Sequence, residues 1–215
     1  MECCFCEELD NLYDNQYYCE LGGRIKAVSR IVIETDNWYA VPTLGCLTVG
    51  YILLICKQHH QSLANLDKEL FFELLKIKNL VEKTLFERLG LDCLAFEHGT
   101  TDPCYHGTNT IDHVHLHIIP FTKTIWSDLT KTHGLFEFVA VADYEELLSK
   151  WQLELPKTYL LFQDLDKVIY YKPEAEGYPS QFFRKILAPY FSADQWNWKE
   201  EYYTNNFIRT LELFK

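Results

Sequence analysis

The chain reads His-Val-His-Leu-His-Ile-Ile-Pro over residues 113–120, and this stretch decides the fold. Histidines alternate with apolar residues in it, and such alternation is typical of a half-buried strand. Because every second side chain of a strand shares one face, we expect the three imidazoles to project together, while Val114, Leu116 and Ile118 face the core. Histidine suits nucleophilic, acid–base and metal-ligand chemistry near neutral pH, so the row is interpreted as a functional site.

The composition of the chain bounds its class. Its 215 residues suit one large domain or a domain with an extension. Hydrophobic residues make up 48% and aromatic residues 15%, so core material is ample and disorder is not expected. The net charge of −11 and the lack of a Lys/Arg-rich stripe argue against a nucleic-acid polymer as partner.

The sequence predicts a cytoplasmic location. No apolar run approaches the roughly 18 residues of a membrane-spanning helix, so no membrane partner is expected. The acidic start of the chain has no signal-peptide pattern. A disulfide framework is therefore the less favoured interpretation of the eight cysteines.

Short strands and one long helix account for the first two thirds of the chain. Besides the histidine strand, strands are expected at residues 29–34, 38–41, 51–56, 93–97 and 135–142. A helix is expected at 66–89, with Asn65 as its N-cap and Gly90 as its stop. This order predicts the α+β class, with an antiparallel sheet arranged as a meander that the helix interrupts.

The rest of the chain is expected to form a C-terminal extension. A short helix is predicted at 143–151, a hairpin at 158–163 and 167–171, and helices at 180–191 and 200–214. Aromatic residues such as those at 196, 198, 202 and 203 add large apolar area, so we expect this part to be packed.

The alternating histidines resemble the signature of the histidine triad (HIT) superfamily. Gly50, an apolar strand, Lys57-Gln-His59 and Ser62-Leu63 resemble the segment that precedes the long helix of that family. The opening Cys3-Cys4-Phe5-Cys6 resembles that of zinc-containing members. The resemblance implies a HIT-like fold, with a histidine triad domain at 1–142 and a C-terminal extension at 143–215 packed on it.

The resemblance implies a nucleotide phosphate hydrolase. His115, the middle histidine, would attack the α-phosphorus of a dinucleoside polyphosphate or a related nucleotide conjugate, and water would then release the nucleotide from the nucleotidyl-histidine intermediate. A neutral imidazole is a good nucleophile at pH 7, and covalent catalysis splits one hard displacement into two easier ones. His117 shares the face of His115 and would assist by stabilising developing charge.

Three alternatives stay open at this point. A nucleotidyltransferase would keep the first half-reaction and use an acceptor other than water. A catalytically silent sensor or adaptor would only bind a nucleotide. A metallohydrolase would use the histidine row to hold a catalytic metal. The resemblance also suggests a homodimer.

Four residues near the strands are expected to bind substrate. Asn109 and Thr110 match a polar pair that precedes the first histidine in the family, in a loop whose backbone amides can approach an anion. Thr43 stands where members often carry a ribose-binding Asn or Asp, and Glu97 where many carry an Asn or Gln. These two departures leave the identity of the substrate open. An ordinary turn and a strand end are the structural alternatives for the loop and for Thr43.

Two further substrate-binding residues are expected in the C-terminal extension. On a helix, Gln181, Arg184 and Lys185 would share a face, and Arg184 could bind phosphate in fork geometry. Longer relatives of the superfamily have a similar helix. A solvated helix face is the alternative.

The cysteine spacing indicates a metal site. Cys3 and Cys6 have the spacing that brings two thiolates to one metal. In zinc-bearing relatives, a cysteine pair joins two histidines, so the resemblance implies a structural zinc on Cys3, Cys6, His59 and His113. Cys4 makes the pairing ambiguous, and His60 could replace His59.

Overall fold

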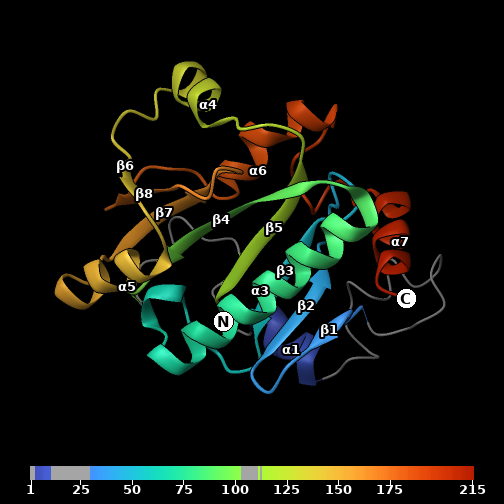
Figure 1. Ribbon diagram of the computed structural model, residues 1–215, viewed down its shortest axis with the longest axis horizontal. Helices are drawn as coiled ribbons and strands as arrows, with labels where there is room; N and C mark the ends of the chain where they lie inside the picture. Colours follow the sequence, from blue (N-terminus) through green and yellow to red (C-terminus); the bar gives the residue numbers. More distant parts are fainter. Residues whose placement is uncertain (1–2, 11–29, 103–110, 112) are drawn as a thin grey trace.

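The computed structural model describes residues 3–10, 30–102, 111 and 113–215 (Figure 1). Within them, eight strands form an antiparallel sheet of order β1-β2-β3-β5-β4-β7-β8-β6. The strands are β1 (Ile33–Glu34), β2 (Trp38–Pro42), β3 (Ile52–Cys56), β4 (Asp92–Thr100), β5 (His115–Phe121), β6 (Val139–Val141), β7 (Thr158–Gln163) and β8 (Ile169–Pro173). The helices are α1 (Cys4–Asp10), α3 (Lys68–Leu89), α4 (Trp126–His133), α5 (Tyr144–Leu153), α6 (Phe182–Leu187) and α7 (Thr204–Leu213).

The predicted fold class, an α+β fold with an antiparallel sheet and one long helix, is confirmed. The long helix α3 begins at Lys68, and its N-cap is Asp67, whose carboxylate accepts the backbone N–H of Leu70. The prediction of Asn65 as N-cap is wrong, because Asn65 ends a separate 3₁₀ turn. Gly90 ends the helix as predicted, in the left-handed conformation that favours glycine.

Two helices, α1 and α4, were not predicted from the sequence. The segment 126–133 forms α4, and the strand predicted at 135–142 shrinks to β6. The Asp164 carboxylate accepts the backbone N–H groups of Ile125 and Trp126 at the start of α4. Because this cap comes from a residue 39 positions along the chain, no local signal marks the helix.

The strands do not follow a simple meander, which corrects the predicted order. β5 lies between β3 and β4, so that His117 pairs with Leu53 on one side and with Phe96 on the other. The chain passes from β3 through α3 to β4 and leaves the place between them for β5. The histidine strand is therefore central in its part of the sheet.

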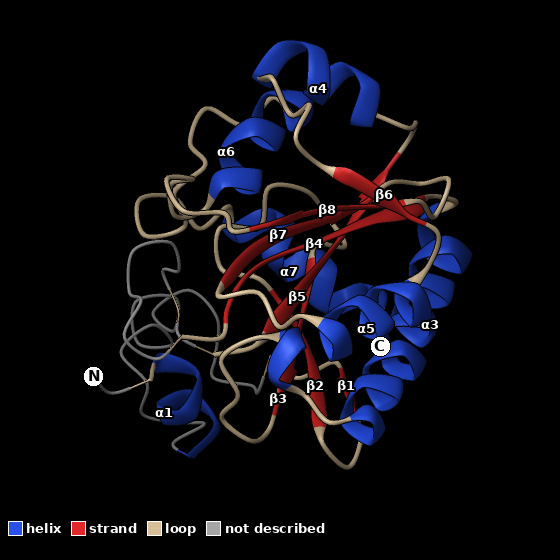
Figure 2. Ribbon diagram, turned by 90° about the vertical axis from the view of Figure 1, so that its left-hand side faces the viewer, coloured by secondary structure: helices blue, strands red, loops and turns tan. Residues whose placement is uncertain are grey.

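The two faces of the sheet have different covers (Figure 2). On one face, Leu74 of α3 and Leu147 of α5 belong to the same core cluster as Val114, Leu116 and Ile118. This outcome confirms the predicted inward set of the histidine stretch. The opposite face is covered by α4, α6 and α7, and by α1 near β2 and β3. The histidines of β5 face this second side.

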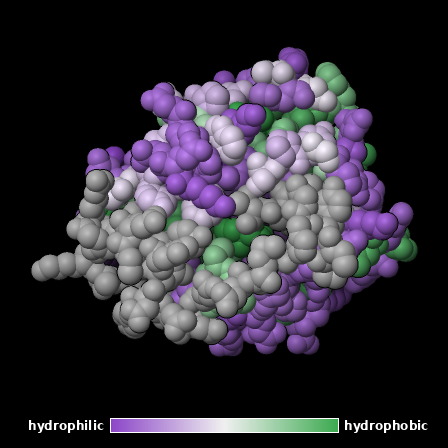
Figure 3. Space-filling view, turned by 180° about the vertical axis from the view of Figure 1, so that it is seen from behind, coloured by the Kyte–Doolittle hydropathy of each residue, from purple (hydrophilic) through white to green (hydrophobic). Residues whose placement is uncertain are grey.

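The C-terminal hairpin continues the same sheet. β7 pairs with β4 along its length and β8 pairs with β7, as the predicted hairpin requires. The division into a domain at 1–142 and an extension at 143–215 stays a prediction. Seen from the side opposite α3, the described surface is mostly hydrophilic, and hydrophobic side chains gather near its centre (Figure 3). None of the described helices combines the length and apolarity needed to cross a bilayer.

Candidate functional site

A cavity of about 800 Å³, its open mouth included, lies on the face of the sheet opposite α3. Leu53, Phe96, His115 and His117 contribute to its floor, while α1 and α6 supply walls. A concave, mostly apolar surface with a few polar side chains is the usual form of a small-molecule site. The structure thus brings two of the three predicted histidines to one concave surface.

His115 presents one ring nitrogen to the cavity. Its Nδ1 lies 2.7 Å from the backbone carbonyl oxygen of His113, so we assign the proton to Nδ1. Nε2 then keeps its lone pair, which is the form a nucleophile needs. Burial lowers the pKa of His115, although the hydrogen bond to His113 opposes this, and the ring is held neutral.

His117 is oriented by a phenol. The Tyr51 hydroxyl lies 2.8 Å from His117 Nδ1, and burial, which raises the pKa of Tyr51 to about 12, keeps it protonated. We assign this hydroxyl as the donor and His117 Nδ1 as the acceptor. The proton of the imidazole then sits on Nε2. Burial, together with the nearby His115 and Arg184, places the pKa of His117 well below its usual range. His117 is therefore a neutral hydrogen-bond donor toward the cavity.

Arg184 is a buried cation in the cavity wall. Its Nε donates to the Trp196 carbonyl oxygen at 3.1 Å and its Nη2 to the Gly45 carbonyl oxygen at 2.7 Å. Its Nη1 is buried and has no hydrogen-bond partner among the described residues. No carboxylate of the described chain forms an ion pair with it. Such an uncompensated buried charge favours an anionic ligand.

The two other residues predicted on this helix face, Gln181 and Lys185, lie in different surroundings. Gln181 lines the cavity in a left-handed conformation with φ 58°, and its side chain bonds Asn197 and the backbone N–H of Trp198. Backbone strain of this kind gathers at functional sites. Lys185, by contrast, is exposed and lies over the ring of Trp196, so it does not share the cavity with Arg184.

Four side chains form a cluster that can hold a metal ion. One ligand atom from each residue lies within 4.8 Å of all the others, and the four are Cys3, Cys6, His59 and His113. Sulfur-to-nitrogen distances are 3.3 Å from Cys3 to His113, 3.4 Å from Cys6 to His59 and 3.5 Å from Cys6 to His113. Tetrahedral zinc with S and N ligands sets such separations at about 3.3–3.8 Å. The donor set and its geometry fit this ion.

His113 is prepared for metal binding by its second nitrogen. Nε2 donates to the Cys56 carbonyl oxygen at 2.8 Å, so Nδ1 carries the lone pair that faces the two sulfurs. Burial lowers the pKa of His113 to about 4, which keeps the ring neutral as a ligand must be. His60 lies outside the cluster, and its carbonyl oxygen accepts the backbone N–H of Val114.

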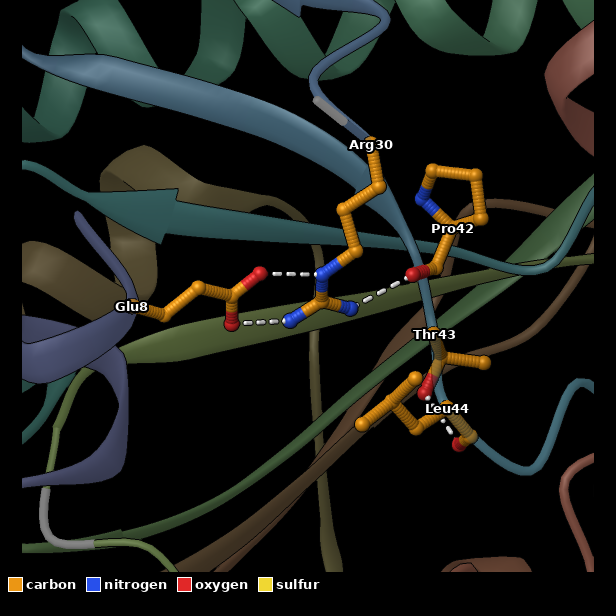
Figure 4. Close-up of polar contacts among 5 residues, drawn as sticks. All are labelled: Glu8, Arg30, Pro42, Thr43 and Leu44. Carbon is orange, nitrogen blue, oxygen red and sulfur yellow. Dashed lines mark hydrogen bonds and ion pairs between the residues drawn. The ribbon is translucent and has the colours of Figure 1, made fainter. Parts of the chain in front are cut away.

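The helix α1 links the metal cluster to the cavity. Phe5 packs edge-on against His113 and His115, with ring centroids 5.7 and 5.4 Å apart. Glu8 accepts two hydrogen bonds from Arg30, and Arg30 Nη1 donates to the Pro42 carbonyl oxygen at 2.6 Å (Figure 4). Both charged residues are buried and line the cavity.

Thr43 follows Pro42 at the end of β2 and also lines the cavity. Its hydroxyl donates to the Leu44 carbonyl oxygen at 2.9 Å (Figure 4). The hydroxyl proton is therefore used locally, and the oxygen is left as an acceptor toward a ligand.

Glu97 does not lie in the cavity, which corrects its expected place in the substrate site. Its carboxylate is buried on the α3 side of the sheet, where it accepts the Leu63 backbone N–H at 3.0 Å and the Tyr159 hydroxyl. Successive side chains of a strand point to opposite faces, so the neighbour His98 lines the cavity instead. Asn109 and Thr110 lie outside the described residues.

Several cavity residues were missed by sequence reasoning. Phe5 belongs to the Cys3–Cys6 opening, but no cavity role was predicted for it. Glu8 and Arg30 carry no local motif, because only the fold brings the two charges of this buried ion pair together. His98 could have been found by extending the alternation of β4 beyond Phe96.

Comparison with known proteins gives a family match. Residues 24–124 match the sequence model of the HIT domain. No curated protein matches the chain significantly. Among solved structures, the chain is similar to a hypothetical histidine triad nucleotide-binding protein from Sulfolobus tokodaii, with 24% identity over 48% of this chain and 67% of that chain and a TM-score of 0.37.

Two other solved structures show comparable similarity. A Zn-bound histidine triad family protein from Mycobacterium smegmatis is 20% identical, over 57% of this chain and 76% of that chain, with a TM-score of 0.41. A HIT family hydrolase from Clostridium thermocellum is 18% identical, over 56% of this chain and 91% of that chain, with a TM-score of 0.37.

The environment of Glu97 predicts a pH effect on stability. Burial raises the pKa of Glu97 from 4.5 to about 8, against the hydrogen bonds from Tyr159 and Leu63. The folded protein then binds more protons than the unfolded chain between these pH values. The stabilisation is full below about 4.5 and is lost as pH rises toward about 8, by about 1.4 kcal/mol per pH unit.

Glu97→Gln removes this titration and keeps one acceptor for Leu63. We expect the unfolding free energy of Glu97→Gln, relative to wild type, to rise with pH from about 5 to 8. Urea unfolding of both proteins in the same metal state measures it, with Glu87→Gln on the exposed side of α3 as the matched control. Parallel pH profiles of Glu97→Gln and wild type would contradict the assignment.

Proposed function

Because this chain carries a HIT domain over residues 24–124, we propose that it is a nucleotide phosphate hydrolase that acts at the α-phosphorus of a dinucleoside polyphosphate or a related nucleotide conjugate. The observation that carries the proposal is the orientation of His115. Its Nδ1–H is bound to a backbone carbonyl, and its Nε2 lone pair faces the cavity.

The reaction proceeds in two displacements. His115 Nε2 attacks the α-phosphorus, the bond from phosphorus to the leaving-group oxygen breaks, and the leaving group departs with the electron pair. The nucleotide is then held on His115 through a phosphorus–nitrogen bond. Water attacks the same phosphorus and releases a proton to solvent, the phosphorus–nitrogen bond breaks, and His115 regains its lone pair.

Neighbouring groups stabilise the charge that develops on the phosphoryl oxygens. His117 donates through Nε2–H, because Tyr51 occupies its other nitrogen. The free Nη1 of Arg184 offers a charged donor in the same cavity. Donors that are fixed before reaction and shielded from water stabilise such charge most effectively. The anionic substrate in turn compensates the buried guanidinium.

The remaining contacts define the nucleotide. Thr43 accepts a hydrogen bond from a ribose hydroxyl, and Gln181, the N-cap of α6, lines the same cavity. Phe5 and Leu53 give an apolar surface for the nucleoside. Asn109 and Thr110 contribute phosphate contacts from their loop, as the family resemblance implies.

The ion that we propose for the Cys3, Cys6, His59 and His113 cluster is zinc, in a structural role. A closed site with four protein ligands leaves no open position for chemistry. The bound ion fixes α1 to the sheet and holds the ring of His113. It therefore also steadies the carbonyl group that orients His115. A cytoplasmic location and a homodimer stay predictions.

Replacing the nucleophile tests the function. His115→Ala should lower mononucleotide release from a panel of dinucleoside polyphosphates and nucleoside phosphoramidates by at least about 10³-fold, because the covalent route is lost. Release is measured by chromatography, and an alkaline quench followed by mass spectrometry traps the adduct on wild type. His133→Ala, at an exposed site on α4, is the matched control and should retain activity.

The outcomes separate the competing functions. Activity in His115→Ala would contradict the mechanism. A wild type that binds nucleotide but forms no adduct would identify a sensor. An adduct that decays only when an acceptor other than water is added would identify a nucleotidyltransferase.

The metal assignment has its own test. Wild type purified with zinc should hold about one ion per chain, and Cys6→Ser should lose most of it, because a thiolate ligand is removed. Cys4→Ser, on the same helix but outside the cluster, should retain the ion. Metal content is measured by plasma mass spectrometry. Equal zinc in Cys6→Ser and wild type would contradict the ligand set.

A further inference from the structure

His98 is a third imidazole on the wall of the cavity, and the mechanism above does not use it. It belongs to β4, two residues after Phe96, and lines the same space as His115 and His117. Both of its ring nitrogens are buried, and neither has a hydrogen-bond partner among the described residues. Leaving buried polar atoms without partners is costly, so a group that supplies the missing hydrogen bond is expected.

The strand register places His98 beside the reacting ring. The ladder between β4 and β5 ends at the pair Phe96–His117. The same register, continued by two residues, brings His98 opposite His115. Cross-strand neighbours of this kind have Cβ atoms about 5 Å apart. Burial and the proximity of His115 lower the pKa of His98 to about 4, so the ring is neutral and offers one donor and one acceptor.

The order of the strands gives the cavity two sides. β3 and β2 lie on one side of the histidine row and carry Leu53 and Thr43, where the nucleoside was assigned above. β4 lies on the other side and carries Phe96 and His98. When the α-phosphorus of the substrate lies at His115, the part of the substrate that is not the nucleoside extends past β5 toward β4.

We propose that His98 is a substrate-binding residue that donates a hydrogen bond to the phosphate chain beyond the α-phosphorus, on the β4 side of His115. This inference rests on the proposed function. It assigns the leaving-group half of the substrate as a chain of phosphoryl oxygens, which accept hydrogen bonds from a neutral imidazole.

Two ligands distinguish the halves of the site. A nucleoside monophosphate lacks the leaving-group half, whereas a methylene-bridged dinucleoside polyphosphate carries it and resists cleavage. Calorimetric titration of the zinc-loaded protein with each ligand should give binding to both. His98→Leu should raise the Kd of the bridged ligand by about 10-fold and change the Kd of the monophosphate by less than about 2-fold.

Two further variants keep the test decisive. His98→Gln retains a donor and should restore most of the affinity for the bridged ligand. His133→Leu, on exposed α4, is the matched control and should bind both ligands as wild type does. If His98→Leu does not fold, as judged by circular dichroism and zinc content, His98→Ala replaces it.

The outcomes separate this inference from the proposed function. If His98→Leu loses affinity equally for both ligands, or loses none for the bridged ligand, the role of His98 is overturned and the hydrolase proposal stands. A wild type that binds neither ligand overturns both.

Discussion

The hydrogen bond from His115 Nδ1 to the carbonyl oxygen of His113, 2.7 Å long, is the interaction on which the site depends. It decides which ring nitrogen faces the cavity. The acceptor is itself fixed, because the ring of His113 donates to the Cys56 carbonyl and faces the sulfurs of Cys3 and Cys6. Three residues of one segment, 113–115, therefore connect a metal-ligand cluster, a backbone carbonyl and the proposed nucleophile. The zinc ion proposed for this cluster would be structural, yet one of its ligands, His113, also supplies the carbonyl group that orients His115.

Burial gives this arrangement its chemical character. Removal from water keeps His115 and His117 neutral, so one provides a lone pair and the other a donor at neutral pH. The same burial leaves the charge of Arg184 uncompensated, since it forms no ion pair among the described residues and its guanidinium donates to the carbonyl groups of Gly45 and Trp196. An acidic chain of net charge −11 can in this way present a locally electropositive cavity to a phosphate.

Local patterns predicted the parts that local physics controls. The two-residue period of the histidine stretch correctly predicted which of its side chains are buried, and Gly90 correctly predicted the end of α3. The errors come from contacts between distant segments. Glu97 was expected in the site because its position was known only along the chain, whereas the pairing of β4 with β5 and β7 turns it toward α3. The cap of α4 by Asp164 and the pair of Glu8 with Arg30 likewise have no signature in nearby sequence.

The tautomer of His115 in the folded, zinc-loaded protein is the most direct test of the central claim. Nitrogen-15 NMR of histidine-labelled protein at neutral pH reads the protonation of each ring nitrogen. We expect a neutral His115 with its proton on Nδ1, and neutral His113 and His117 with theirs on Nε2. A His115 that carries its proton on Nε2, or that is doubly protonated, has no lone pair to offer phosphorus and would contradict it.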